Sequence, residues 1–226
     1  MIRFFAPIAA LVMASMLATI AEAQPRRLER SEVLQRKAVM AWTECIAAER
    51  REEAEQVLLL DYREDGPQTD LNELAQTRIS QRCFNAMPRR YRSIRLSGLP
   101  FAGGLAEFLI ENHPENLIRR LSMAAIGEEA QTFSYTDVVA NCVVRGAPHL
   151  AAGVFATEVE TPEELEALGQ LQPVIEICTR GGAAIDASPL AMRSMLATAS
   201  YRILACLLYT CPSPRDGATS RMPSSA

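Results

Sequence analysis

The spacing of the cysteines constrains this chain more than any other feature of its sequence. Cys45 and Cys83 lie 38 positions apart, and Cys142 and Cys178 lie 36 positions apart. The chain has no Cys-x-x-Cys pair, the usual spacing of zinc-ribbon and thioredoxin-type sites, so an even set of cysteines favours disulfide bonds. We therefore predict two local bonds, Cys45–Cys83 and Cys142–Cys178, with crossed pairing between the two sets as the alternative.

The residues around the cysteines repeat as well. Matching positions include Ile46 with Val143, Val57 with Val154, Ser97 with Ser188, Leu99 with Leu190 and Leu105 with Leu196. Ordinary helical spacing produces some such matches, but together with the cysteines they indicate an internal duplication. We expect helical repeat 1 over residues 24–112, a linker segment over 113–133 and helical repeat 2 over 134–205.

Apolar residues in each repeat recur at helical spacing, which predicts an all-α fold of two tandem four-helix units. The expected helices are 37–48, 51–60, 69–83 and 99–111 in the first unit, and 136–144, 148–157, 161–178 and 189–204 in the second. A further helix, 115–126, is expected in the linker. The only strand candidate is the short stretch 93–96.

The third helix of the second unit has the clearest start. Thr161, Pro162 and Glu164 form a capping box with proline at the first helical position. Pro173 predicts a kink or a break within the same helix. An apolar stripe is expected to face the core and to turn Cys178 inward; it comprises Leu165, Leu168, Leu171, Ile175 and Cys178.

The first residues read as an export signal. Arg3 precedes an uncharged apolar stretch over 4–20, and Ala21-Glu22-Ala23 fits the small-x-small cleavage rule. A membrane anchor is the rival interpretation, but the stretch is short for a span of about 20 residues. We expect residues 1–23 to be a cleaved signal peptide, which predicts a periplasmic or secreted protein with no transmembrane helix after cleavage.

The last residues resemble the in-frame translation of a transposase-type sequencing adapter. The match runs from Cys206 to the end, and Cys211 is the only departure from the constant positions of that translation. Its prolines and serines form no periodic apolar face. We therefore expect residues 206–226 to be a translated sequencing-adapter artefact, and the natural end of the chain then lies outside this sequence.

Charge and histidine content narrow the possible functions. The chain has 23 basic and 27 acidic residues, so it has no overall basic field for nucleic acid. Its two histidines, His113 and His149, each lie beside a proline, where a turn or helix-end role is expected. The acidic run 158–166 lacks the pattern of an EF-hand loop and is expected to be a solvated helix start. We identify no catalytic, cofactor or metal site.

Basic residues are distributed unevenly. Six arginines fall within 18 residues, interleaved with Phe84 and Tyr91; they are Arg78, Arg82, Arg89, Arg90, Arg92 and Arg95. In an exported protein such an anion patch would bind an anionic envelope component or a protein partner. The alternative is a solvated turn whose guanidinium stems pack on Tyr91.

These features favour an exported, non-enzymatic interaction or structural module. The alternative is a helical periplasmic hydrolase that cleaves wall glycan with carboxylates alone. The chain lacks the Glu-Ser dipeptide expected of lytic transglycosylases. A pocket that encloses a carboxylate with a raised pKa would favour this alternative.

Overall fold

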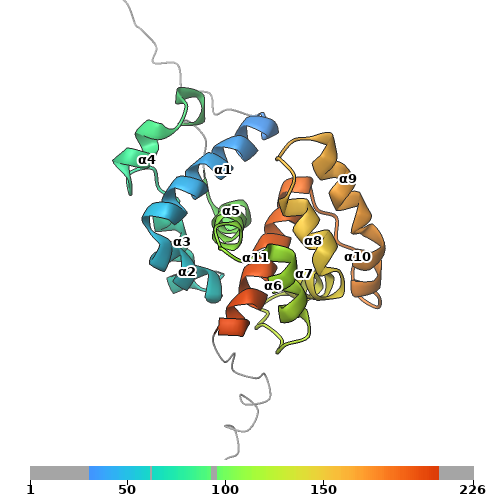
Figure 1. Cartoon of the computed structure of the whole chain (residues 1–226). Helices are drawn as coiled ribbons and strands as arrows, with labels where there is room; N and C mark the ends of the chain where they lie inside the picture. The colour runs from blue at the N-terminus through green and yellow to red at the C-terminus, as the bar shows by residue number, and fades with distance from the viewer. Residues whose placement is uncertain (1–30, 62, 93–95, 209–226) are drawn as a thin grey trace, which may run out of the picture.

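All regular structure in the part of the chain that the structure describes is helical, which confirms the all-α prediction (Figure 1). The structure, a computed structural model, describes residues 31–61, 63–92 and 96–208. The expected signal peptide, most of the expected adapter segment and residues 93–95 of the strand candidate lie outside these ranges. The elements are α1 (Glu32–Glu49), α2 (Arg51–Leu59), α3 (Asp65–Leu74), α4 (Gln81–Ala86), the 3-10 helix η1 (Arg89–Tyr91), α5 (Gly98–Glu111), α6 (Leu117–Ala125), α7 (Tyr135–Gly146), α8 (Pro148–Phe155), α9 (Pro162–Gln170), α10 (Gln172–Cys178) and α11 (Pro189–Leu208).

The expected third helix is divided in both halves of the molecule. In the second half α9 ends before Pro173, as the missing N–H of proline requires. In the first half Ser80 caps a separate helix α4 by accepting a hydrogen bond from the Cys83 N–H. The expected start at Thr69 is wrong: α3 begins at Asp65, and the Thr69 hydroxyl donates to the Asp65 carbonyl within the helix.

The two disulfides between described cysteines are local, which confirms the predicted pairing over the crossed alternative. The Cα atoms of Cys45 and Cys83 are 5.7 Å apart, and those of Cys142 and Cys178 are 5.8 Å apart. The first bond joins α1 to α4, and the second joins α7 to the end of α10. Each bond therefore fixes the divided third segment of its half to the first helix of the same half.

The apolar stripe of the second half is only partly buried. Leu171 and Ile175 lie in the core, and Cys178 is half-buried against it. Leu165 is 58% exposed, so its expected inward position is wrong. The reason is that Glu164 takes the inward position in the first turn of α9, so the adjacent Leu165 faces away from the core.

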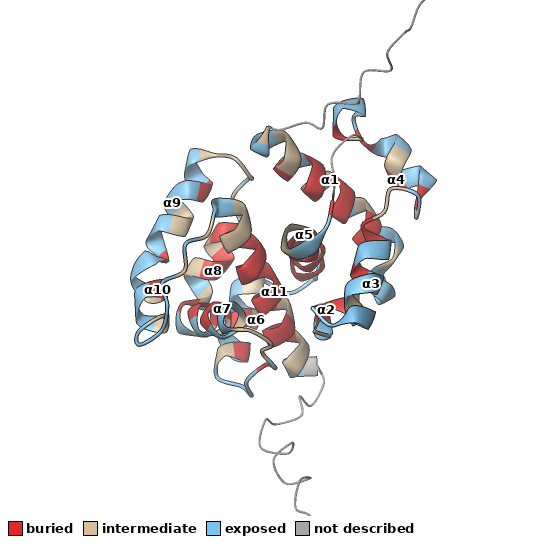
Figure 2. Cartoon of the chain, turned by 180° about the vertical axis from the view of Figure 1, so that it is seen from behind, coloured by how far each residue is buried: buried red, intermediate tan, exposed pale blue. Residues whose placement is uncertain are grey.

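Helices α5 and α11 form the centre of the molecule and join its two halves. Figure 1 places α1 to α4 on one side of this pair and α7 to α10 on the other. The buried residues in Figure 2 lie on the inner faces of the helices around this pair. Arg202 of α11 also ties the halves, since its Nε donates to the Leu58 carbonyl over 2.9 Å and its Nη1 pairs with Asp137 of α7. The halves therefore share one core.

Two adjacent glycines allow the central helices to approach closely. A Cβ atom on Gly103 would overlap Ser194 of α11, and one on Gly104 would overlap Thr43 of α1. At the sequence offset of 91, Ser194 is the counterpart of Gly103. A contact between a residue and its own counterpart is what an internal two-fold arrangement would produce. The duplication, and with it the division into two repeats, stays a prediction.

The disulfides bear on the redox environment of the protein, and the length of its apolar helices bears on whether it can span a membrane. Two local disulfides are compatible with an oxidising, exported environment. No single described helix is long and apolar enough to cross a membrane. Helices α7 and α8 together are long and apolar enough, but the pair is bent by 103° at its junction.

We predict that each disulfide stabilises the fold by closing a loop in the unfolded chain. Replacing both cysteines of one pair by serine should lower the free energy of unfolding by about 4 kcal/mol for each pair. Urea denaturation of the two double variants measures this loss. A change below about 1 kcal/mol in both would contradict the chain-entropy explanation.

We also predict that the central crossing tolerates no added methyl group. Gly103→Ala and Gly104→Ala should each destabilise the protein by about 1–3 kcal/mol, because the new Cβ overlaps a packed neighbour. Gly153→Ala in α8 is the matched control: nothing lies within 4 Å of its Cβ position, and alanine there should add up to about 1 kcal/mol of helix stability. Thermal denaturation would disprove the close approach if all three variants were equally stable.

Candidate functional site: a groove above a buried ion network

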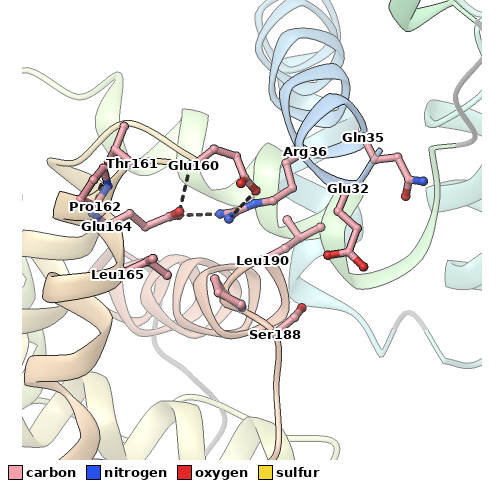
Figure 3. A pocket seen from close by; sticks show the side chains of 11 residues that line it. Glu32, Gln35, Arg36, Glu160, Thr161, Pro162, Glu164, Leu165, Ser188 and Leu190 are labelled. Carbon is pink, nitrogen blue, oxygen red and sulfur yellow. Dashed lines mark hydrogen bonds and ion pairs between the residues drawn. The ribbon is translucent and has the colours of Figure 1, made fainter. Parts of the chain in front are cut away.

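A groove opens where the N-terminal turns of α1, α9 and α11 meet (Figure 3). Its volume is about 490 Å³, within the size range of small-molecule sites. The side chains that define its chemistry are Glu32, Arg36, Glu160, Glu164, Leu165 and Leu190. They come from both halves of the chain, so the groove exists only when the halves are packed together.

Each of the three helices begins with a side chain that caps its own backbone. The Ser31 hydroxyl accepts from the Leu34 N–H, Thr161 from the Glu164 N–H and Ser188 from the Ala191 N–H. Proline follows the cap in α9 and α11, where its fixed φ suits the first turn and its missing N–H costs nothing. Local sequence therefore determines where these helices start, and the packing of the two halves brings their first turns together at the groove.

The floor of the groove is a network of buried charges centred on Glu164, which is fully buried. One carboxylate oxygen of Glu164 accepts from Arg36 Nη2 at 2.5 Å and from Arg193 Nη1 at 3.0 Å. The other accepts from the Glu160 N–H at 3.0 Å. Arg36 also pairs with the Glu160 carboxylate at 2.8 Å, and Arg193 Nε lies 3.0 Å from both oxygens of Glu107. The network therefore joins α1, α5, α9 and α11.

The network keeps Glu164 ionised. Burial by itself raises the pKa of this carboxyl group, but hydrogen bonds from Arg36 and the Glu160 N–H and the charges of Arg36 and Arg193 outweigh it. The net result is a lowered pKa. Because a general acid must carry a proton near neutral pH, Glu164 is unsuited to protonate a leaving group.

A raised pKa occurs elsewhere, at the C-terminal end of α5. Partial burial and the neighbouring charge of Glu107 raise the pKa of Glu111 to about 7. Glu111 is not among the residues that line the groove. The raised pKa of Glu111 therefore supplies no general acid to the groove.

The predicted arginine set divides into two groups. Arg78, Arg89 and Arg90 are exposed and make no ion pair with any described residue. Arg82 pairs with Glu49 at 2.8 Å, and Arg92 donates to the carbonyls of Met87 and Asn85. Arg95 lies outside the described residues. We call the five described residues of the set the arginine surface; its role in anion binding stays a prediction.

Aromatic rings support part of the arginine surface. The guanidinium of Arg90 lies 5.2 Å from the Tyr91 ring centre, and that of Arg92 lies 5.0 Å from the Phe84 ring centre. Such contacts order a guanidinium group without neutralising it. The interleaved aromatic residues therefore hold the exposed Arg90 and the partly buried Arg92 in place.

The histidines lie outside the groove. Both are exposed, and the His113 Nδ1 accepts from the Glu115 N–H in a turn. Among the residues that the structure describes, no three histidine, cysteine or acidic side chains come close enough to hold a metal ion.

The buried ion network was missed at the level of sequence. The acidic run that contains Glu164 was expected to be solvated, which is wrong for Glu164 because Arg36 and Arg193 cover it in the fold. A signal was present: Glu107 interrupts the otherwise apolar face of α5, and Arg193 interrupts that of α11. A charge on an apolar face indicates a buried partner elsewhere.

Comparisons with protein-family models, with curated proteins and with solved structures find no match to this chain. The interpretation of the groove and of the arginine surface therefore rests on their own chemistry.

We predict that the charge on Glu164 stabilises the packing of the two halves. Glu164→Gln leaves Arg36 and Arg193 without their shared counter-charge and should lower the free energy of unfolding by about 3–5 kcal/mol. Glu163→Gln, at an exposed position of the same helical turn, is the matched control and should change it by less than about 0.5 kcal/mol.

The same pair of variants gives a pH test. Because the pKa of Glu164 is lowered in the fold, its contribution is complete above the unfolded-state value of about 4.3 and is lost as the pH falls below it. Denaturation between neutral and acidic pH should therefore show a smaller acid destabilisation in Glu164→Gln than in Glu163→Gln. Equal pH profiles would contradict the assignment.

Proposed function

We propose that this protein is an exported, non-enzymatic binding module, periplasmic or secreted, whose arginine surface binds an anionic component of the cell envelope. The observation that carries this proposal is the segregation of charge. Residues 78–95 hold six arginines and no acidic residue. Three of the side chains, Arg78, Arg89 and Arg90, are exposed without an ion pair to a described residue. Guanidinium groups in this state are suited to phosphate and carboxylate groups.

The segment that carries these arginines is anchored to α1 although its helices are short. The Cys45–Cys83 bond joins it covalently to α1, and the Ser80 hydroxyl donates to Glu49 over 3.0 Å. Arg92 closes the end of α4 through its bonds to backbone carbonyls. An anchored surface loses less conformational entropy when it binds than a free loop does, and this favours a binding role.

The chemistry of the groove supports a non-enzymatic function over the hydrolase alternative. Its buried carboxylate, Glu164, is held ionised by two arginines, and Glu160 is paired with Arg36. Glu111, whose pKa is raised, lies elsewhere.

A triple substitution tests the proposed binding. Arg78→Ser/Arg89→Ser/Arg90→Ser should weaken binding to phosphatidylglycerol-containing vesicles by up to about 100-fold, because each basic residue near an anionic membrane contributes about 1 kcal/mol. The measurement is vesicle sedimentation at about 50 mM salt, where electrostatic contacts are weakly screened. A parallel arm uses polygalacturonate, so that a polysaccharide preference is distinguished from a lipid preference.

The control removes the same number of charges elsewhere. Lys37→Ser/Arg119→Ser/Arg180→Ser changes three exposed basic residues outside the arginine surface and should retain native binding in both arms. Equal binding by the two triple variants to vesicles and to polygalacturonate, or no binding by the native protein to either, would refute the proposal.

A further inference from the structure

We propose that the groove between the first turns of α1, α9 and α11 binds an organic cation, namely an ammonium or guanidinium group carried on an apolar body. This inference is independent of the proposed function, because it concerns another surface and the opposite sign of charge. It rests on the net charge of the groove, on the state of its helix termini and on its apolar wall.

Counted over the residues that the structure describes, the groove and its floor carry a net negative charge. Glu32, Glu160 and Glu164 line it, and Glu107 lies in the network beneath. Two guanidinium groups, those of Arg36 and Arg193, oppose these four carboxylates. The formal balance of −2 favours a cation over an anion. Both guanidinium groups pair with carboxylates through their Nη atoms, and of their nitrogen atoms only the buried Arg36 Nε has no hydrogen-bond partner among the described residues.

Helix N-termini ordinarily attract anions, and the N-termini of α1, α9 and α11 meet at the groove. Each has its own cap, since Ser31, Thr161 and Ser188 accept hydrogen bonds from first-turn N–H groups. Acidic residues in the first turns of α1 and α9 further offset the helix dipoles. The termini therefore define the shape of the groove without making it an anion site.

Glu32 is the carboxylate best placed for a ligand. It is exposed and makes no ion pair with a described residue. Figure 3 shows it on the α1 side of the groove, across from Leu165 of α9. Glu160 is the second carboxylate that a ligand could reach, because its side chain is 21% exposed although it pairs with Arg36. A cation bound between Glu32 and Glu160 would reduce the formal negative charge of the groove and its floor by one.

An apolar wall faces these carboxylates. Leu165 is 58% exposed and lines the groove together with Leu190, Pro162 and Pro189. An apolar body that covers Leu165 removes hydrocarbon surface from water, which contributes about 25 cal/mol per Å². The buried ion network below keeps the wall and the carboxylates at a fixed separation, as a preorganised site requires. The groove thus matches a ligand with one charged end and one apolar end.

The test uses phenethylammonium as the probe and the full chain as the receptor. Calorimetric titration should show binding of phenethylammonium, weaker binding of the neutral analogue 2-phenylethanol and none of the anion 3-phenylpropanoate. Amide chemical shifts should change at the first turns of α1, α9 and α11. Binding of the anion as tight as that of the cation, or shift changes confined to another surface, would overturn the proposal.

Substitutions at exposed positions separate charge from apolar contact. Glu32→Gln should weaken phenethylammonium binding by up to about fivefold, the size of an exposed ion pair, and Leu165→Ser should weaken both the cation and the neutral analogue. Glu163→Gln, which removes an equal charge outside the groove lining, should bind like the native chain.

Two comparisons decide the outcome. Glu32→Gln and Glu163→Gln with equal affinities would show that the groove does not recognise the cation. The Arg78→Ser/Arg89→Ser/Arg90→Ser variant should bind phenethylammonium normally, so failure of the vesicle experiment and failure of the groove proposal can be told apart.

Discussion

The arrangement of this molecule depends on Arg193, whose guanidinium group lies buried between Glu107 of α5 and Glu164 of α9. Burial of an unpaired charge costs several kcal/mol, so each of these groups is tolerable only while its partners remain in place. Arg36 extends the same constraint to α1. A shift of one half against the other would separate the pairs, and the network therefore selects a single packing of the halves.

Two kinds of constraint act at two levels of the fold. Within each half, a disulfide ties the first helix to a distant segment and reduces the entropy of the unfolded chain. Between the halves there is no covalent bond among the described residues other than the backbone; close packing at Gly103 and the buried ion network act instead. Each half is thus stabilised by its own disulfide, and the two halves are held together by close helix packing and buried ion pairs.

This scaffold separates surfaces of opposite character. The arginine surface on α4 and η1 and the acidic helix α9 lie on opposite sides of the central α5–α11 pair (Figure 1). Because the two regions are fixed at a distance, the exposed arginines are not neutralised by the glutamates of α9. This separation of charge is what the two proposed binding roles, one for an anionic partner and one for a cation, both require.

The sequence alone predicted the helical fold, favoured local over crossed disulfides and indicated a kink or break at Pro173, because cysteine spacing, caps and proline act over a few turns or a single loop. The sequence also showed the clustering of the six arginines, because they lie close together along the chain. Only the tertiary structure decided the groove and its ion network. Arg36, Glu107, Glu164 and Arg193 are far apart along the chain, and no local pattern reports which buried charges will meet once helices from both halves pack together.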